Sequence, residues 1–150
     1  MNQQKIQSGV LEDKEGWQEV KLSALVSGRY ICLESTSAYV NSPFTSIAEL
    51  RITDAKGVDI PREDYTIVYA DSEEFGEENG LASLLMDNQP TTFWHTQYSK
   101  EKPGQPHQVV IDLGKNSGIS GFRYLPRMKN STGRVKGYNL YVSKTPFIIK

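Results

Sequence analysis

The sequence predicts an all-β fold in which two antiparallel sheets pack as a sandwich. The first observation is a series of short runs that alternate apolar and polar residues or are apolar throughout. The second is that Gly, Pro, Asn or Ser bounds each run, as turns between strands require. The third is the length of 150 residues, which fits one domain. Two sheets can bury each other's apolar faces, so one sandwich is the expected arrangement.

The strands begin in the N-terminal third of the chain. In WQEVKL (17–22), Val20 and Leu22 face one side, and the charged residues between them face the other. GRYICLES (28–35) places Ile31 and Leu33 on one face in the same way. Further strands are expected at 46–52, 64–70, 107–114, 118–126 and 133–143.

One segment, EENGLASLLM (77–86), has a helical pattern. Ala82, Leu85 and Met86 lie at positions i, i+3 and i+4 and would share one helix face. Gly80 and the short length of the segment limit this helix to a turn or two.

The charge balance excludes two classes of partner. Lysine and arginine number 17, aspartate and glutamate 18, and the formal net charge is −1. Nucleic-acid binding needs a basic face, so no nucleic-acid partner is expected. A polybasic membrane anchor is excluded on the same ground, and no run approaches the roughly 18 apolar residues of a membrane span, so no membrane insertion is expected.

The single cysteine and the N-terminus say little about the cellular compartment. Cys32 rules out an internal disulfide, and its place in a strand-like run indicates a small buried apolar residue. The first residues lack the apolar centre of a signal peptide. Either the protein stays inside the cell, or the chain is a piece of a longer secreted protein.

A turn around Pro90 has the oxygen groups of a calcium site. Asp87, Thr91 and Thr92 stand close together there, and a tight turn adds backbone carbonyls. Calcium takes six to eight oxygen ligands, many of them from the backbone. The alternative is an Asx-turn in which Asp87 bonds its own backbone. The local residues leave both interpretations open.

The residues offer little support for catalysis. His95 and His107 are the only histidines, and neither a G-x-S-x-G nor an H-E-x-x-H motif is present. Glu77, Glu78 and Asp87 are too unspecific to nominate as the paired carboxylates of a glycosidase. His107 leads directly into a strand, which favours a structural role.

Two pairs of polar residues suit a sugar. His95 and Tyr98 lie three positions apart, as do Arg127 and Asn130, so each pair can project from one loop. An aromatic ring covers the C–H face of a sugar, and planar polar groups hydrogen-bond its hydroxyls. A surface salt bridge for Arg127 and a structural hydrogen bond for His95 are the alternatives.

These segments together resemble a known family. LMDNQPTTFWHTQYS (85–99), PHQVVIDLG (106–114), ISGFRYLPR (119–127) and GRVKGYNLYVS (133–143) follow the order and spacing of the coagulation factor 5/8 type C, or discoidin, domain. They are closest to its sugar-binding branch, carbohydrate-binding module family 32, as appended to Bacteroides-type chitobiases and hexosaminidases. The resemblance implies a galactose-binding-like β-sandwich, a jelly roll.

The resemblance also implies that the segments stand in an unusual order. SGVLEDKEGWQEVKL (8–22), GRYICLES (28–35) and SPFTSIAELRI (42–52) are similar to the family's last strands, yet they come first. The chain is either circularly permuted or straddles two tandem modules. We expect one domain over 1–150, with 1–52 equivalent to the family's C-terminal strands, 53–70 as connection and strand, and 71–150 as the family's N-terminal and central part. Residues 8–22 should then lie beside 134–143, with both termini at one end.

The family resemblance implies a structural calcium ion. The positions that match its ligands are Asp87, Gln89, Thr92 and Glu49, with carbonyls near Leu84. Two residues depart from the pattern. Asn88 stands in place of a glycine, but asparagine tolerates a left-handed backbone better than most residues. Gln89 stands in place of a second aspartate, which matters only if that carboxylate is a ligand.

The resemblance implies a sugar site as well. The matching positions are His95, Tyr98, Arg127, Asn130 and Glu78. Phe44, which precedes the SIAEL strand, would add an aromatic wall, with core packing as its alternative.

The function implied is non-catalytic binding of galactose- or N-acetylhexosamine-type glycans. The module would be monomeric, covalently linked to a glycoside hydrolase or a further binding domain, and secreted, periplasmic or on a bacterial cell surface. One alternative is an adhesion module that binds a protein or membrane surface, which apolar loop tips would favour. Another is a hydrolase with an unrecognised site.

Overall fold

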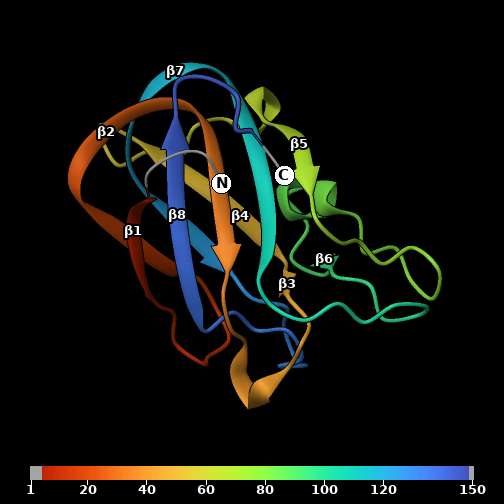
Figure 1. Cartoon of the computed structure of the whole chain (residues 1–150). Helices are drawn as coiled ribbons and strands as arrows, with labels where there is room; N and C mark the ends of the chain where they lie inside the picture. Colours follow the sequence, from red (N-terminus) through yellow and green to blue (C-terminus); the bar gives the residue numbers. More distant parts are fainter. Residues whose placement is uncertain (1–4, 149–150) are drawn as a thin grey trace.

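Two long strands, β2 (Gln18–Ser35) and β7 (His107–Leu125), run through both layers of a β-sandwich in the computed structural model, which describes residues 5–148 (Figure 1). They pair with each other antiparallel almost from end to end. Every strand pair is antiparallel, and the predicted all-β sandwich is confirmed.

The larger layer holds the second half of β2 and the first half of β7. Residues 30–35 of β2 pair with 107–112 of β7 on one side and with β8 (Gly137–Ser143) on the other. β1 (Lys5–Val10) extends the layer beyond β8, and β5 (Thr66–Ala70) extends it beyond β7.

The smaller layer holds the other halves of the same two strands. Residues 18–21 of β2 pair with 121–124 of β7, and β4 (Glu49–Asp54) pairs with β7 on its far side. The register of β2 shifts between Lys21 and Val26 and again between Gly28 and Tyr30. Such irregularities bend a strand, and Figure 1 shows both long strands arching from one layer to the other.

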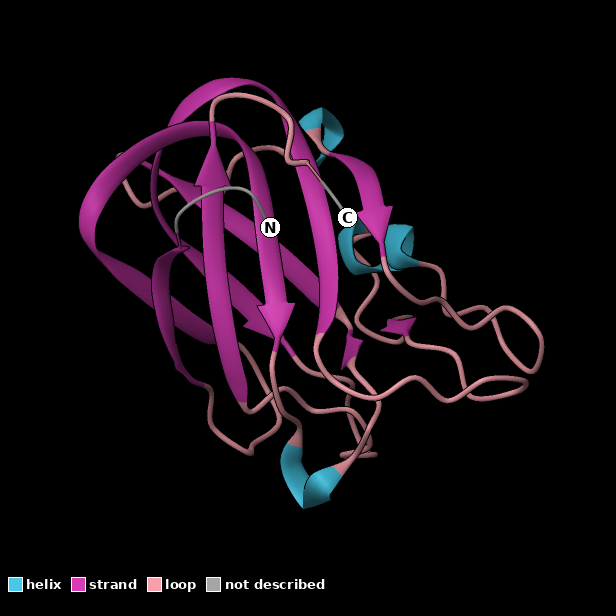
Figure 2. Ribbon diagram, in the orientation of Figure 1, coloured by secondary structure: helices cyan, strands magenta, loops and turns pink. Residues whose placement is uncertain are grey.

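Loops and short elements gather at one end and one side of the sandwich (Figure 2). A small second sheet pairs β3 (Ser46–Ile47) with β6 (Trp94–His95). Three 3₁₀ turns complete the fold: η1 (Tyr39–Asn41), η2 (Arg62–Asp64) and η3 (Ala82–Met86). The helix expected at 77–86 is therefore one 3₁₀ segment, whose apolar Ala82 and Leu85 are buried.

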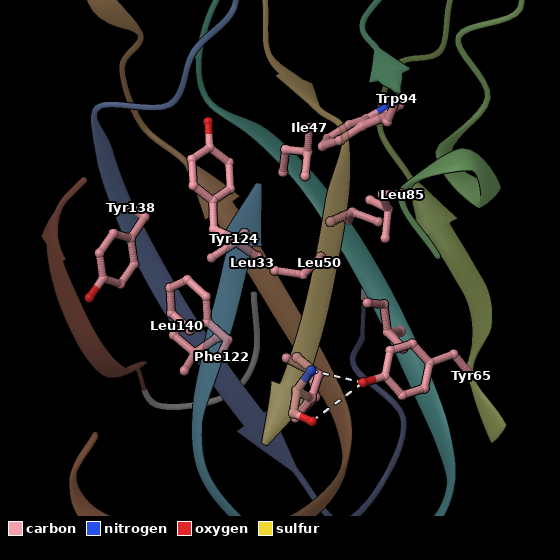
Figure 3. Close-up of a cluster of buried hydrophobic side chains, with 14 of the residues drawn as sticks. Leu33, Ile47, Leu50, Tyr65, Leu85, Trp94, Phe122, Tyr124, Tyr138 and Leu140 are labelled. Carbon is pink, nitrogen blue, oxygen red and sulfur yellow. Dashed lines mark hydrogen bonds between the residues drawn. The ribbon is translucent and has the colours of Figure 1, made fainter. Parts of the chain in front are cut away.

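The core lies between the layers and continues under β6. Figure 3 shows Leu50 and Phe122 from the smaller layer facing Leu33 and Leu140 from the larger one. Trp94 is 1% exposed, and its indole Nε1 donates to the carbonyl of Ser72 over 2.8 Å. The large ring therefore anchors β6 in the core without leaving its N–H group unpaired.

The predicted strands are present, but several boundaries differ. The runs 17–22 and 28–35 form one strand, as do 107–114 and 118–126. The alternation of apolar and polar residues does not predict β1, although the family resemblance implies a strand that begins near Ser8. β1 is an edge strand with exposed and half-exposed side chains only, so it lacks the apolar face that marks a strand in sequence.

The expected contact between 8–22 and 134–143 is found in part. Ser8, Gly9 and Val10 pair with β8. Residues 18–21 instead pair with β7. The first 52 residues do not form a separate unit, because β1, β2 and β4 share one sheet with β7 and β8. The terminal residues 1–4 and 149–150, which bear on whether the ends share one side, lie outside the described residues.

Cys32 is fully buried in β2, as expected of a small apolar residue. Burial raises the pKa of its thiol, so the side chain stays protonated. Across residues 5–148, no helix has the length and apolar character needed to span a membrane.

The pairing of β2 with β7 in the smaller layer depends on a glycine. A Cβ atom at Gly121 would lie 2.0 Å from the carbonyl oxygen of Val20, in the backbone of the facing strand. Gly121→Ala must push the strands apart, and we expect it to lower the free energy of unfolding by about 1–3 kcal/mol. Urea denaturation of the whole chain measures this.

Gly104→Ala is the matched control, because a Cβ atom there meets nothing within 4 Å. Its effect should stay within about 0.5 kcal/mol, as for other surface substitutions. Equal stability of the two variants would show that the close approach at Gly121 does not constrain the fold.

Candidate functional site

All six residues predicted for a sugar site line one cavity. The cavity has a volume of about 390 Å³ and is called the first cavity below. Its lining comprises Phe44, Glu78, His95, Tyr98, Lys102, Arg127, Asn130 and Thr132. These residues come from four separate segments, which meet because β3 and β6 pair and place the loop after β6 beside the loop after β7.

Three rings form one wall of the first cavity. The His95 and Tyr98 rings meet edge to face, with centroids 4.9 Å apart. Phe44 lies 5.5 Å from His95 and 6.0 Å from Tyr98, centroid to centroid. Phe44 is half-buried, and its carbonyl accepts a hydrogen bond from the Gln105 side chain at 2.9 Å. It therefore belongs to the cavity wall and not to the core.

The hydrogen bonds of His95 fix its tautomer. Nδ1 lies 2.6 Å from the carbonyl oxygen of Thr96, and a carbonyl only accepts, so Nδ1 carries the proton. Burial lowers the pKa of His95, which keeps the ring neutral at pH 7. Nε2 is then an acceptor. The structural hydrogen bond considered for His95 exists, but it occupies only one of the two ring nitrogens.

Tyr98 and Glu78 form a pair at the rim. The Tyr98 hydroxyl donates to Oε1 of Glu78 at 2.9 Å. Burial and then this carboxylate raise the pKa of Tyr98 to about 12, because a phenolate would face a negative charge. Glu78 keeps acceptor capacity at its other oxygen, so the pair presents a fixed ring and a carboxylate together.

Arg127 lies over the Phe93 ring at the edge of the first cavity. Its guanidinium carbon lies 4.4 Å from the centre of the Phe93 ring. Among the described residues, no carboxylate forms an ion pair with it, so the surface salt bridge considered in its place is not found within 5–148. Asn130 accepts a bond from the backbone of Thr132 at 2.9 Å through Oδ1, which leaves its amide group to donate.

A buried carboxylate that the sequence did not reveal holds these loops. Glu74 is fully buried. Its Oε1 accepts from the backbone N–H groups of Tyr98 and Ser99, each at 2.9 Å, and its Oε2 from those of Gly76 at 2.7 Å and Glu77 at 2.8 Å. Burial acts to raise the pKa of Glu74, but the backbone donors outweigh it and hold that pKa well below its usual range. The acids in EEFGEE look alike in sequence, so nothing there distinguished Glu74.

His107 is structural, as its position before a strand indicated. The ring is fully buried, and Nδ1 meets Oδ2 of Asp71 while Nε2 meets the carbonyl of Pro43, both at 2.8 Å. Although burial lowers the pKa of His107, Asp71 and the Pro43 carbonyl raise it overall. The ring thus ties the start of β7 to the loop that carries Phe44.

The turn proposed for calcium is closed by hydrogen bonds of its own residues. Asp87 Oδ1 accepts from the Gln89 N–H at 2.9 Å, and Thr92 Oγ1 donates to Oδ2. The Leu84 carbonyl accepts from the Asp87 N–H at 3.5 Å. Asn88 has a φ of 63°, so the left-handed backbone expected at this position is present. The Asx-turn that was the alternative interpretation is therefore part of the same turn.

Glu49 faces this turn from β4, and its contacts test whether a cation fits. Oε1 accepts from Arg51 at 2.6 Å and from the Asn88 N–H at 2.9 Å. Oε2 is buried and has no hydrogen-bond partner within the described chain. Burial raises the pKa of Glu49 to about 7, Arg51 opposes this, and Asp87 adds to it.

The buried Oε2 of Glu49, which lacks a partner within the described residues, indicates that the turn fits a dication. A cation near Oε2 would give the orphaned oxygen a partner and relieve the repulsion between Glu49 and Asp87. No group of three or more His, Cys, Asp or Glu side chains in the described part of the chain forms a metal site by itself. Backbone carbonyls and Thr92 would have to supply the remaining ligands, which is usual for calcium.

Comparisons with known proteins agree with the fold. Residues 68–146, slightly more than half of the chain, match the model of the F5/8 type C domain. That span contains the end of β5, all of β6 to β8 and every lining residue of the first cavity except Phe44.

Three relatives contain a region similar to this chain. A sialidase of Micromonospora viridifaciens is 42% identical over 79 residues, which is 52% of this chain and 12% of the relative. An A type blood N-acetyl-alpha-D-galactosamine deacetylase of Flavonifractor plautii is 28% identical over 104 residues, 69% of this chain and 12% of the relative. A galactose oxidase of Gibberella zeae is 31% identical over 96 residues, 63% of this chain and 14% of the relative.

The chain thus spans only 12% to 14% of the length of these relatives, as one domain within a larger protein would. The family match, the antiparallel sandwich and the ordered motifs between 85 and 143 agree with one another. The chain belongs to the F5/8 type C domain family and has its galactose-binding-like β-sandwich fold.

Proposed function

We propose that this chain is a non-catalytic carbohydrate-binding module and that the first cavity holds a terminal sugar unit. One observation carries the proposal: His95, Tyr98, Arg127 and Asn130, from separate loops, line one open cavity with Phe44. A sugar needs a ring for its C–H face and fixed polar groups for its hydroxyls, and this cavity offers both.

The proposed binding geometry assigns one role to each group. Tyr98, whose ring is fixed by Glu78, packs on the C–H face of the sugar. Arg127, with five N–H donors in one plane, donates paired hydrogen bonds to adjacent hydroxyls. The unprotonated Nε2 of His95 accepts from a hydroxyl, and the Asn130 amide donates to a hydroxyl or acetamido oxygen.

A binding role is favoured over hydrolysis. Among the residues that line the first cavity, Glu78 is the only carboxylate, and it is bonded to Tyr98. Glycoside hydrolysis uses two carboxyl groups on opposite sides of the scissile bond.

The sugar class proposed is galactose or an N-acetylhexosamine. Its support is the cavity chemistry together with relatives named as a sialidase, an N-acetyl-alpha-D-galactosamine deacetylase and a galactose oxidase. We further propose a parent protein that is a secreted, periplasmic or surface-bound bacterial glycoside hydrolase of the chitobiase or hexosaminidase type. The module would be monomeric within it.

Circular permutation is part of the proposal. Its support is that 1–52, which resemble the family's last strands, share one sheet with β7 and β8, and that β1 pairs with β8. Termini that lie close together make such permutation tolerable. The tandem-module alternative predicts that the same chain, expressed alone, exchanges its first strands between copies.

One observation favours the alternative of an adhesion module. Val40 is 81% exposed in η1, and Phe75 is 69% exposed in the loop after β5, so two loops carry apolar tips. Neither residue lines the first cavity. The proposal therefore predicts binding of sugars and not of lipid vesicles, and the reverse result would favour the alternative.

The first test is the loss of Arg127. We expect Arg127→Ala to weaken galactose binding by about tenfold or more, because hydrogen bonds from a charged group contribute roughly 1.5–3 kcal/mol each. Isothermal titration measures this against a wild-type dissociation constant on the order of 0.1–1 mM, the range for a shallow site.

Arg29→Ala is the control for Arg127→Ala, since Arg29 pairs with Asp112 in the sheet and lies outside the first cavity. It should leave the affinity for galactose unchanged. An unchanged affinity in the Arg127 variant would remove Arg127 from the proposed site.

The second test uses the neutral state of His95. Because burial lowers the pKa of His95, sugar affinity should be constant above about pH 6.5 and fall only at lower pH, where protonation removes the Nε2 acceptor. Titrations across pH, with folding checked by circular dichroism, give the profile. Stronger binding on acidification would contradict the acceptor role.

The third test concerns calcium, for which Glu49, Asp87 and Thr92 with the carbonyls of Leu84 and Gln89 are the proposed ligands. A calcium ion that binds only the native state should raise the melting temperature. A calcium concentration 100 times the dissociation constant would raise the free energy of unfolding by about 2.7 kcal/mol.

The effect of calcium on stability should also depend on pH. The pKa of Glu49 is raised to about 7 in the folded chain, above the ordinary value near 4.3. Without calcium, Glu49 therefore costs stability as pH rises from about 4.3 through about 7, and calcium removes that cost by holding the ionised form. The increase in melting temperature should be larger at about pH 8 than at about pH 5.5. A melting temperature that a strong chelator does not move would count against the ion.

A further inference from the structure

A second cavity adjoins the first one and shares one of its residues. It has a volume of about 510 Å³ and is lined by Pro90, Thr91, Phe93, Arg127, Met128 and Lys129. Arg127 lines both cavities. The two cavities are therefore neighbours at Arg127, whose guanidinium carbon lies 4.4 Å from the centre of the Phe93 ring.

The lining of the second cavity differs from that of the first. Pro90, Phe93 and Met128 give it an apolar wall, whereas the first cavity has rings edged by several hydrogen-bonding groups. Its polar groups are the Thr91 hydroxyl and two cations, and its described lining includes no carboxylate. A ligand here gains from an apolar group and from a hydrogen-bond acceptor that faces Arg127.

Hydrogen bonds within the chain fix both walls of the second cavity. One wall belongs to the turn that Asp87 and Thr92 close. In the other wall, the Asn130 N–H donates to the Met128 carbonyl at 2.8 Å, and the Lys129 N–H donates to Oε1 of Glu15 at 3.0 Å. A preformed site spares a ligand the cost of ordering it.

We propose that the second cavity binds the second unit of a glycan whose terminal unit fills the first cavity, and that it selects an N-acetylhexosamine at that place. This inference rests on the proposed sugar-binding function. The acetamido methyl group packs on Phe93 and Met128, and the acetamido oxygen accepts from Arg127. A plain hydroxyl at the same place could accept from Arg127 but would bring no methyl group to the apolar wall of Phe93 and Met128.

The shared arginine decides in favour of a sugar over other occupants. Five planar N–H donors allow one guanidinium to serve acceptors on two adjacent sugar units at once. An apolar side chain of a protein partner would pack on the apolar wall but would offer no hydrogen-bond acceptor to Arg127. Arg127 therefore links the specificity of both cavities.

The test compares two disaccharides that differ at one substituent. Lactose and N-acetyllactosamine both end in galactose, but only the second carries an acetamido group on its second unit. We expect the 150-residue chain to bind N-acetyllactosamine about three- to tenfold more tightly than lactose, since burial of one methyl group and an acceptor at Arg127 both favour the first of these sugars. Galactose alone should shift no amide resonance of Thr91, Met128 or Lys129, whereas N-acetyllactosamine should shift them.

Met128→Ala separates this inference from the proposed function. It should abolish the preference for N-acetyllactosamine over lactose and leave galactose affinity unchanged, because Met128 lines only the second cavity. Val68→Ala, an exposed site on β5, is the control and should preserve the preference.

Equal affinity for the two disaccharides in the wild-type chain, with galactose still bound, would overturn the second cavity as a subsite and leave the sugar function standing. The absence of binding of galactose, N-acetylgalactosamine and N-acetylglucosamine alike would overturn both.

Discussion

The continuous pairing of β2 with β7 is the constraint on which the rest of the structure depends. Each strand contributes one half to each layer, so the same hydrogen-bonded ladder sets the geometry of both. The other strands attach to this pair, with β8 and β4 on opposite flanks. The loops that leave its ends therefore start from fixed positions, which is why residues from distant segments meet in the first cavity.

The cavities are held by a second level of constraint, made of buried polar groups. Glu74 gathers four backbone N–H groups from two loops, and His107 ties β7 to the loop of Phe44. Trp94 anchors β6 from below. These residues touch no proposed ligand, yet they fix the rings and the guanidinium in place. A preformed site of this kind keeps binding favourable although a sugar buries few atoms.

The sequence allowed much of this to be predicted, for identifiable reasons. Ile31, Leu33 and their neighbours alternate clearly, so the buried strands were recognisable, and the spacing of His95, Tyr98, Arg127 and Asn130 located the first cavity. The continuity of β2 was hidden, because the bend between Lys21 and Val26 interrupts the pattern without interrupting the strand. Glu74 and Met128 were missed, since burial of one acid among several and proximity across loops are properties of the folded chain.

The central claim is that the first cavity binds a sugar. The most direct measurement is a titration of the isotope-labelled chain with galactose, N-acetylgalactosamine and N-acetylglucosamine, followed by NMR. The account predicts saturable shifts at Phe44, His95, Tyr98, Arg127 and Asn130 with at least one of these sugars. The account would be contradicted if none of the three sugars shifted any resonance and no glycan on a broad array were bound. Shifts confined to the apolar tips at Val40 and Phe75 would contradict it as well.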